Sequence, residues 1–104
     1  MKPRIGWSPR ALRRATEAAL FIAEENPSAA AEWARGLFDS VRPLVQFPEM
    51  GRVVPEVGRS DIREIMFRGY RVVYRVAPRL VEVLTVRHGK RRFSFREVGV
   101  SKPK

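Results

Sequence analysis

Residues 63–91 limit the folds open to this chain more than any other stretch. They contain three short runs rich in Val, Ile, Tyr and Phe, separated by Arg68-Gly69 and by Ala77-Pro78-Arg79. Runs of β-branched and aromatic residues that are punctuated by Gly and Pro are typical of antiparallel strands joined by short turns. We therefore expect a meander of three sequential antiparallel strands in the C-terminal half.

Arginine recurs inside these runs as well as between them. Successive side chains of a strand point to opposite faces of the sheet. The middle run separates two arginines from its aromatic residues: Arg71, Val73 and Arg75 against Tyr70, Val72, Tyr74 and Val76. The last run divides in the same way: Val83, Thr85 and Arg87 against Leu84, Val86 and His88. The sheet is thus expected to have an apolar face and a solvent-exposed, arginine-bearing face, and we expect function on the latter.

Two helices are expected before the meander. Ser8-Pro9 and Asn26-Pro27 each combine a favourable N-cap with a proline suited to the first helical turn. The first helix should end near Glu25, and Pro43 should kink or end the second near Arg42. Each helix has an apolar stripe: Leu12, Ala15, Ala19 and Ile22, then Ala30, Trp33, Ala34, Leu37, Val41 and Leu44. The short link between the helices predicts an antiparallel hairpin.

A short first strand over residues 2–7, with Ile5 and Trp7 on one side, and a loop over residues 51–60 complete the chain. The predicted fold class is α+β, in the order β-α-α-β-β-β, with an antiparallel sheet and a helical hairpin packed on one face. The core should bring strand residues against helix residues: Tyr70, Val72, Tyr74, Leu84 and Val86 against Leu12, Ile22, Trp33 and Leu37. At 104 residues the chain is expected to be a single domain, 1–104, with a basic tail from about 90 to 104.

The formal net charge of +10 is concentrated in the second half of the chain. Residues 1–57 hold 8 Lys or Arg and 7 acidic residues, whereas residues 58–104 hold 13 and 4. Such an uneven distribution of charge favours an anionic partner: nucleic acid, an acidic protein segment or an anionic membrane surface. The alternative is a solvated basic surface that only aids solubility.

The sequence lacks the residues that several classes of chemistry require. The absence of cysteine excludes disulfides and thiolate metal sites, and the sequence carries no GxGxxG or GK[ST] nucleotide motif. His88 is the only histidine. His88 falls on the same face of its predicted strand as Leu84 and Val86, which predicts a partly buried structural residue. The alternative is a role in proton transfer or substrate contact. We expect no metal and no cofactor.

The sequence indicates no membrane segment. The longest purely apolar run, residues 18–23, is too short to cross a bilayer. The first residues lack the apolar region of a signal peptide. We therefore expect a cytoplasmic protein without a membrane partner.

Three segments together carry a family resemblance. They are WSPRALRRATEAALFIAEENPSAA, which starts at residue 7, FPEMGRVVPE after the second helix, and the run IREIMFRGYRVVYRV…VEVLTVRHGKR. In this order they resemble the ParE/RelE superfamily of toxins from type II toxin–antitoxin modules, over about residues 5–91. The resemblance implies a compact β-α-α-β-β-β toxin that is neutralised when an antitoxin segment wraps around it.

The superfamily has two branches with different implied targets. RelE-like members are ribosome-dependent endoribonucleases that use arginines and lysines on the sheet and a C-terminal tyrosine. The resemblance places Arg71 and Arg91 on the arginine positions and Arg63 near one lysine position. No tyrosine follows Arg91, and Phe93 and Phe95 occupy that region. A phenylalanine can stack on a base but cannot transfer a proton.

The combination of PEMGR, REI and HGKR resembles ParE-type members more closely, and these imply DNA gyrase as the target. We therefore favour a non-catalytic gyrase inhibitor. The alternative is a RelE-like ribonuclease that cleaves messenger RNA on the ribosome, with Arg71, Arg91 and His88 as catalytic candidates. A plain nucleic-acid-binding module is a third hypothesis.

A cognate antitoxin is the expected partner under both toxin hypotheses. Its segment should combine acidic and apolar residues at helix or strand spacing, because charge speeds encounter and apolar burial holds the complex. The candidate partner-binding residues come from the strands and the tail: Arg63, Arg71, Arg75, Arg87, Arg91, Phe93 and Phe95.

Overall fold

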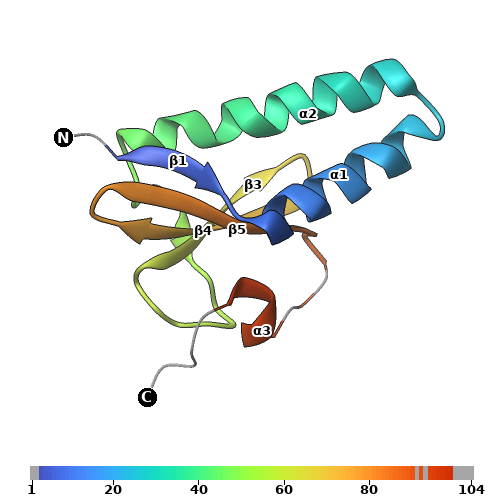
Figure 1. The fold of residues 1–104 in the computed structure, drawn as a ribbon. Coiled ribbons are helices and arrows are strands. Elements are labelled where there is room, and N and C mark those ends of the chain that lie inside the picture. Colours follow the sequence, from blue (N-terminus) through green and yellow to red (C-terminus); the bar gives the residue numbers. More distant parts are fainter. Residues whose placement is uncertain (1–2, 91, 93, 100–104) are drawn as a thin grey trace.

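The computed structural model describes residues 3–90, 92 and 94–99. The α1–α2 hairpin covers one face of a five-stranded sheet, and the loop after β2 and the short helix α3 lie on the other (Figure 1). In chain order the elements are β1 (Arg4–Trp7), α1 (Pro9–Ala23), α2 (Pro27–Val41), a 3-10 turn η1 (Arg42–Val45), β2 (Arg52–Val53), β3 (Ile62–Phe67), β4 (Tyr70–Ala77), β5 (Leu80–His88) and α3 (Phe95–Val98). The predicted α+β class is confirmed.

Both predicted helix starts are confirmed. The Ser8 hydroxyl accepts a hydrogen bond from the Ala11 N–H (3.0 Å) and donates one to the Leu84 carbonyl (2.9 Å), which ties the start of α1 to β5. Asn26 accepts from the Ala29 N–H (3.1 Å) at the start of α2. Helix α1 ends at Ala23, slightly before the predicted Glu25, and α2 gives way to η1 at Arg42, as the position of Pro43 predicts.

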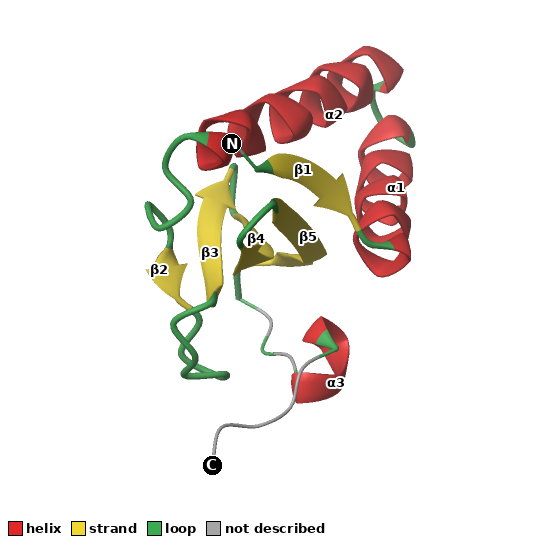
Figure 2. Ribbon diagram, turned by 60° about the vertical axis from the view of Figure 1, so that its left-hand side comes forward, coloured by secondary structure: helices red, strands yellow, loops and turns green. Residues whose placement is uncertain are grey.

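The strand order across the sheet is β1-β5-β4-β3-β2, with the two-residue β2 at one edge (Figure 2). The meander β3-β4-β5 is antiparallel, as predicted. The prediction of an entirely antiparallel sheet is wrong, because β1 pairs parallel with β5, Arg4 opposite Leu80. A parallel pair requires a long connection, and here that connection comprises both helices and three strands. The predicted loop over residues 51–60 also contains β2.

The main core lies between the helical hairpin and the sheet, and a smaller second core lies on the opposite face. The main core includes Trp33, Leu37, Val72, Tyr74 and Val86, with Ile22 at its margin. The second core consists of apolar residues from the loop after β2, three strands and α3: Val54, Val57, Ile62, Val73, Leu84 and Val98. Hereafter "the second face" means the sheet face that carries this second core.

Leu84 was predicted to face the helices, and this prediction is wrong. Tyr74 pairs with Val83 and Val73 pairs with Thr85, so Leu84 is an extra residue in β5, a β-bulge. An extra residue inverts the alternation beyond it. Val83 therefore packs in the main core while Leu84 packs in the second core. The order of faces predicted for Val83 and Leu84 is reversed.

No helix among the described residues is long and apolar enough to cross a membrane.

Candidate functional site

The side chains of Arg52, Glu64, Arg71 and Glu56 form a chain of ion pairs on the second face, and we call these four residues the Arg71 network. Arg71 Nε donates to Glu64 Oε1 (2.6 Å), and its two Nη atoms donate to the two oxygens of Glu56 (2.6 and 2.7 Å). Glu64 Oε2 accepts from Arg52 Nε (2.5 Å). Arg71 is only 5% exposed and Glu64 only 2%. The centre of the network, Arg71 and Glu64, is therefore buried, whereas Arg52 at its end is exposed.

Strand register explains why these charges meet. Arg52 pairs with Glu64 across β2 and β3, and β4 runs next to β3, with Val73 opposite Glu64. The loop after β2 places Glu56 over the second face, next to Arg71. The hydrogen bonds that Arg71 donates hold the pKa of Glu56 below its ordinary value. The pKa of Arg71 is raised chiefly by its hydrogen bonds to Glu56 and also by the one to Glu64.

The prediction that Arg71 is solvent-exposed is wrong. The prediction that Arg71, Arg75 and Arg87 share a sheet face with Val73 is right, but each of the three is paired with an acid. Arg75 lies 3.2 Å from Glu82, and Arg87 lies 3.5 Å from Glu97. All four acids of residues 58–104 take part in such ion pairs: Asp61, Glu64, Glu82 and Glu97. The face is therefore largely neutralised within the chain.

Arg63 lies away from that face. It is opposite Tyr74 in the sheet, which packs in the main core. Its guanidinium donates to the carbonyls of Ser60 and Gly51, both at 2.9 Å. These bonds hold together the two ends of residues 51–60. Arg63 therefore stabilises this segment and does not lie in the predicted arginine cluster.

His88 lies on the opposite side of the sheet from Arg71. It pairs with Tyr70, and the two rings meet edge to face with centroids 5.6 Å apart. The imidazole is exposed, so the prediction of a partly buried histidine is wrong. Its Nδ1 accepts a long hydrogen bond from the Lys90 N–H (3.4 Å). Arg71 and His88 are therefore not brought together. Arg91, Phe93 and the side chain of Phe95 lie outside the described residues.

Helix α3 is held on the second face by Glu97. The carboxylate accepts from Arg14 Nε (3.0 Å) and from the Thr85 hydroxyl (2.8 Å), and Arg87 lies 3.5 Å away. Val98 is buried in the second core beside it. The hydrogen bond from Arg14 is the largest cause that lowers the pKa of Glu97, to about 2. This carboxylate joins α1, β5 and the tail.

Glu97 makes stability depend on pH in the acidic range. Its folded-state pKa (about 2) lies below the ordinary value of 4.5, so its ionised form stabilises the fold above pH 4.5, and that contribution is lost as pH falls toward 2. We expect Glu97→Gln to lower the free energy of unfolding by about 1–3 kcal/mol at neutral pH. Urea unfolding at neutral pH and near pH 2 measures this, and the difference from wild type should shrink at the lower pH.

A suitable control is Glu17→Gln. Glu17 also contacts Arg14 (3.2 Å), but its side chain is largely exposed, so its removal should change stability by less than about 1 kcal/mol. Equal effects of the two variants, or a Glu97 effect that persists undiminished near pH 2, would contradict this account of the tail.

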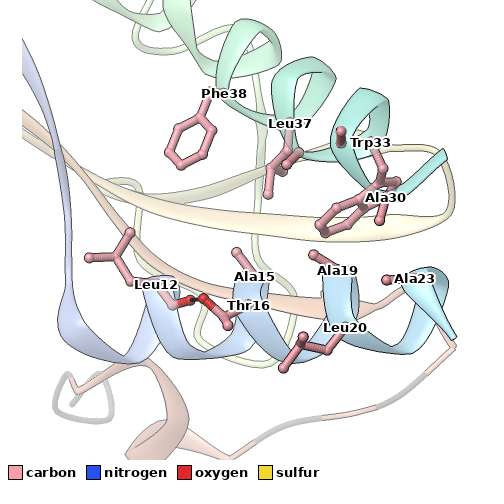
Figure 3. A pocket seen from close by; sticks show the side chains of 12 residues that line it. Leu12, Ala15, Thr16, Ala19, Leu20, Ala23, Ala30, Trp33, Leu37 and Phe38 are labelled. Carbon is pink, nitrogen blue, oxygen red and sulfur yellow. Dashed lines mark hydrogen bonds between the residues drawn. The ribbon is translucent and has the colours of Figure 1, made fainter. Parts of the chain in front are cut away.

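An apolar groove of about 360 Å³ runs between α1 and α2 (Figure 3). Figure 3 shows side chains of both helices along it, and most are alanines or large apolar residues: Leu12, Ala15, Thr16, Ala19, Leu20, Ala23, Ala30, Ala31, Trp33, Ala34, Leu37 and Phe38. Leu20 is 64% exposed, and Leu12 and Phe38 are also exposed. We call these residues the helical groove. The prediction that Leu12 is a core residue is therefore wrong.

This groove is not predicted by the sequence pattern. Alanines on two facing stripes allow close approach of the helices, but here their short side chains leave the space between the helices unfilled. The buried Trp33 lines the groove, and its indole N–H has no hydrogen-bond partner among the described residues. Leucines and a phenylalanine beside the alanine-rich stripes are the signal that could have identified an open groove.

In the part of the chain that the structure describes, no three His, Cys, Asp or Glu side chains are grouped so that they could hold a metal ion.

Comparison with known proteins decides the family. The model of the family described as "ParE toxin of type II toxin-antitoxin system, parDE" matches residues 5–93. The chain belongs to this ParE toxin family. A protein of Sinorhizobium fredii named "Putative toxin Y4kP" is 37% identical over 90 residues, which cover 84% of this chain and 88% of that protein. The resemblance to the ParE/RelE superfamily seen in the sequence is therefore confirmed.

Solved structures share the fold of this ParE family member. The chromosomal ParDE toxin–antitoxin system of P. aeruginosa matches with a TM-score of 0.69 at 16% identity, over 84% of this chain and 96% of that one. A mutant of E. coli RelE in the free state matches with a TM-score of 0.66 at 19% identity, over 94% and 95%. The RelBE2 toxin–antitoxin complex of Mycobacterium tuberculosis matches with a TM-score of 0.53 at 20% identity, over 85% and 99%.

Proposed function

We propose that this ParE family toxin acts in the cytoplasm by inhibiting DNA gyrase without cleaving RNA, and that a cognate antitoxin neutralises it. The observation that carries the non-catalytic part is the burial of Arg71 between Glu56 and Glu64. A ribonuclease of this fold needs that guanidinium on the scissile phosphate, where charge develops. Here its donors serve two carboxylates of the same chain, and His88 lies on the opposite side of the sheet.

The choice of gyrase rests on the ParE family and on the PEMGR, REI and HGKR segments. The alternative, RelE-like cleavage of messenger RNA on the ribosome, is favoured by one observation: the backbone overlaps that of RelE over 94% of the chain. The two hypotheses predict different products from the same preparation of protein, so one pair of assays separates them.

We expect the purified toxin to block supercoiling by gyrase and to leave messenger RNA on translating ribosomes intact. His88→Ala should retain full toxicity, because the exposed imidazole has no catalytic task in an inhibitor. In a ribonuclease that used His88 as acid or base, the same change would slow cleavage by about 10²–10⁴-fold. Cleavage by wild type that is lost in His88→Ala would overturn the gyrase proposal.

The helical groove is the surface that we propose for the antitoxin. Three of its large apolar side chains, those of Leu12, Leu20 and Phe38, are exposed, and large exposed apolar patches usually mark interaction sites. A narrow groove lined by alanines fits one apolar helix face, which agrees with the acidic and apolar antitoxin segment expected from the sequence.

A charge placed in the helical groove should separate binding from folding. We expect Leu20→Asp to weaken antitoxin binding by at least about 100-fold, because a carboxylate would be buried against apolar groups. The melting temperature should change little, since Leu20 is exposed. The control is Phe47→Asp, which alters an exposed apolar residue outside the groove. Calorimetric titration of the antitoxin into each variant measures the effect, and equal losses would disprove this docking site.

A further inference from the structure

The turn that follows η1 presents two large apolar side chains to solvent, and we call residues 47–50 the FPEM turn. Phe47 is 59% exposed and Met50 is 51% exposed. Among the residues placed in the structure, neither belongs to the main core or the second core, and neither lines the helical groove. Packing within the described chain therefore gives no reason for two large apolar residues at these positions.

Backbone hydrogen bonds bring the two apolar residues together. The Phe47 N–H donates to the Pro43 carbonyl (2.8 Å), and the Met50 N–H donates to the Phe47 carbonyl (3.1 Å). The second bond closes a β-turn, in which Pro48 at the second position restricts the backbone. The first and last Cα atoms of such a turn lie within about 7 Å of each other. Phe47 and Met50 are therefore neighbours in space, with Glu49 at the tip between them.

Two side chains from the sheet anchor the FPEM turn. The Tyr74 hydroxyl donates to the Pro48 carbonyl (2.7 Å) and accepts from the Gly51 N–H (3.0 Å), and Tyr74 is fully buried. The Arg63 guanidinium donates to the Gly51 carbonyl (2.9 Å) and to the Glu49 carbonyl (3.4 Å). These bonds fix the backbone before any partner binds, so binding through the turn loses little conformational entropy.

Gly51 shows how closely the turn packs against the sheet. A Cβ atom at this position would lie 2.5 Å from the Glu64 carbonyl oxygen and 2.6 Å from the Tyr74 hydroxyl oxygen. Glycine therefore leaves the space that the hydrogen bonds of Tyr74 require. The PEMGR segment thus contains both residues that anchor the turn and residues that face solvent.

Glu49 adds a negative charge to the exposed part of the turn. Its side chain is 77% exposed, and the Arg63 guanidinium lies 3.7 Å from its carboxylate. A partner that fits this turn has an apolar pocket with a cationic side chain on its rim. Nucleic acid is a poor fit, because the carboxylate would repel its phosphates.

We propose that the FPEM turn is the surface through which this toxin contacts its target protein. Phe47 and Met50 enter an apolar pocket of the target, and Glu49 pairs with a cation on the pocket rim. A few well-placed residues supply most of the binding energy of a protein interface, and this turn holds such residues in a fixed arrangement. The inference rests on the proposed inhibition of gyrase, and it places the target surface outside the helical groove.

The test compares full-length variants in three measurements: inhibition of supercoiling by purified gyrase, growth inhibition in cells, and calorimetric titration with the antitoxin. We expect Phe47→Asp to raise the toxin concentration that half-inhibits gyrase by at least about 30-fold, because a carboxylate would enter an apolar pocket. Glu49→Lys should raise it by about tenfold, through repulsion of the cation on the rim. Antitoxin binding and the melting temperature should change little in both variants.

The matched control is Phe21→Asp. Phe21 is 70% exposed on α1 and does not line the helical groove, so the same substitution there should leave gyrase inhibition unchanged. If Phe47→Asp inhibited gyrase as strongly as Phe21→Asp, the inference would be wrong and the proposed function would stand. Equal losses of gyrase inhibition and antitoxin binding in Phe47→Asp would also overturn it, as would stronger inhibition by Glu49→Lys.

Growth inhibition separates the failure of this inference from the failure of the proposed function. Wild-type protein that leaves gyrase unaffected would overturn the proposed function. Loss of toxicity in a folded Phe47→Asp, with toxicity retained in Phe21→Asp, would then still support the FPEM turn as a target contact. Full toxicity of Phe47→Asp would overturn the inference whichever target the toxin has.

Discussion

Replacement of Glu64 by alanine is expected to lower the free energy of unfolding by about 3–5 kcal/mol. Glu64 is the buried link between Arg52 and Arg71, with both ion pairs at 2.5–2.6 Å. Its removal leaves the buried Arg71 guanidinium with Glu56 as its remaining carboxylate among the described residues, so the desolvation of that charge is offset only in part. Urea unfolding followed by circular dichroism measures the change.

Two comparison variants make this result specific. Glu82→Gln breaks a more exposed ion pair, with Arg75, and should cost less than about 1 kcal/mol. The double variant Glu64→Ala with Arg71→Ala should lose less stability than the two single changes added together, because the second change removes the charge that the first leaves uncompensated. Additive losses, or a Glu64→Ala variant as stable as Glu82→Gln, would mean that the network contributes nothing through its charges.

Leu37→Ala is expected to lower the free energy of unfolding by about 2–5 kcal/mol. Leu37 is fully buried at the centre of the main core, beneath the helical groove. Truncation both removes apolar burial and enlarges a space that the neighbouring alanines already leave open. For a small domain this is a large share of the total stability, so thermal unfolding should show a clearly lower midpoint.

Leu20→Ala is the control for the same groove. Leu20 is mostly exposed, so its truncation should change stability by less than about 0.5 kcal/mol. If Leu37→Ala were as stable as Leu20→Ala, the position of α2 on the sheet would have to be wrong.

Local chemistry in the sequence determined most of the secondary structure. Ser8-Pro9 and Asn26-Pro27 begin both helices, because cap and proline act within one helical turn. Alternation in the middle run predicts the two faces of β4, since Tyr74 enters the main core and Val73 the second core. These signals depend only on residues close together in the sequence, so they do not change with the tertiary structure.

Alternation fails where a long-range contact changes the register. The bulge at Leu84 is a property of the pairing between β4 and β5. The parallel direction of β1 depends on where the chain returns after the hairpin. Neither the bulge nor the parallel pairing of β1 can be recognised from the alternation of apolar and polar residues, which has the same period in parallel and antiparallel strands.

The candidate site was predicted only in part. The sequence alone determined that Arg71, Arg75 and Arg87 share a face and that positive charge is concentrated in the second half. Tertiary structure decided that Glu56 and Glu64 bury Arg71, that His88 lies on the other side, and that the alanines of α1 and α2 leave an open groove. The reason is physical: a charge pattern records which groups are present, whereas burial and pairing depend on segments far apart in sequence meeting in space.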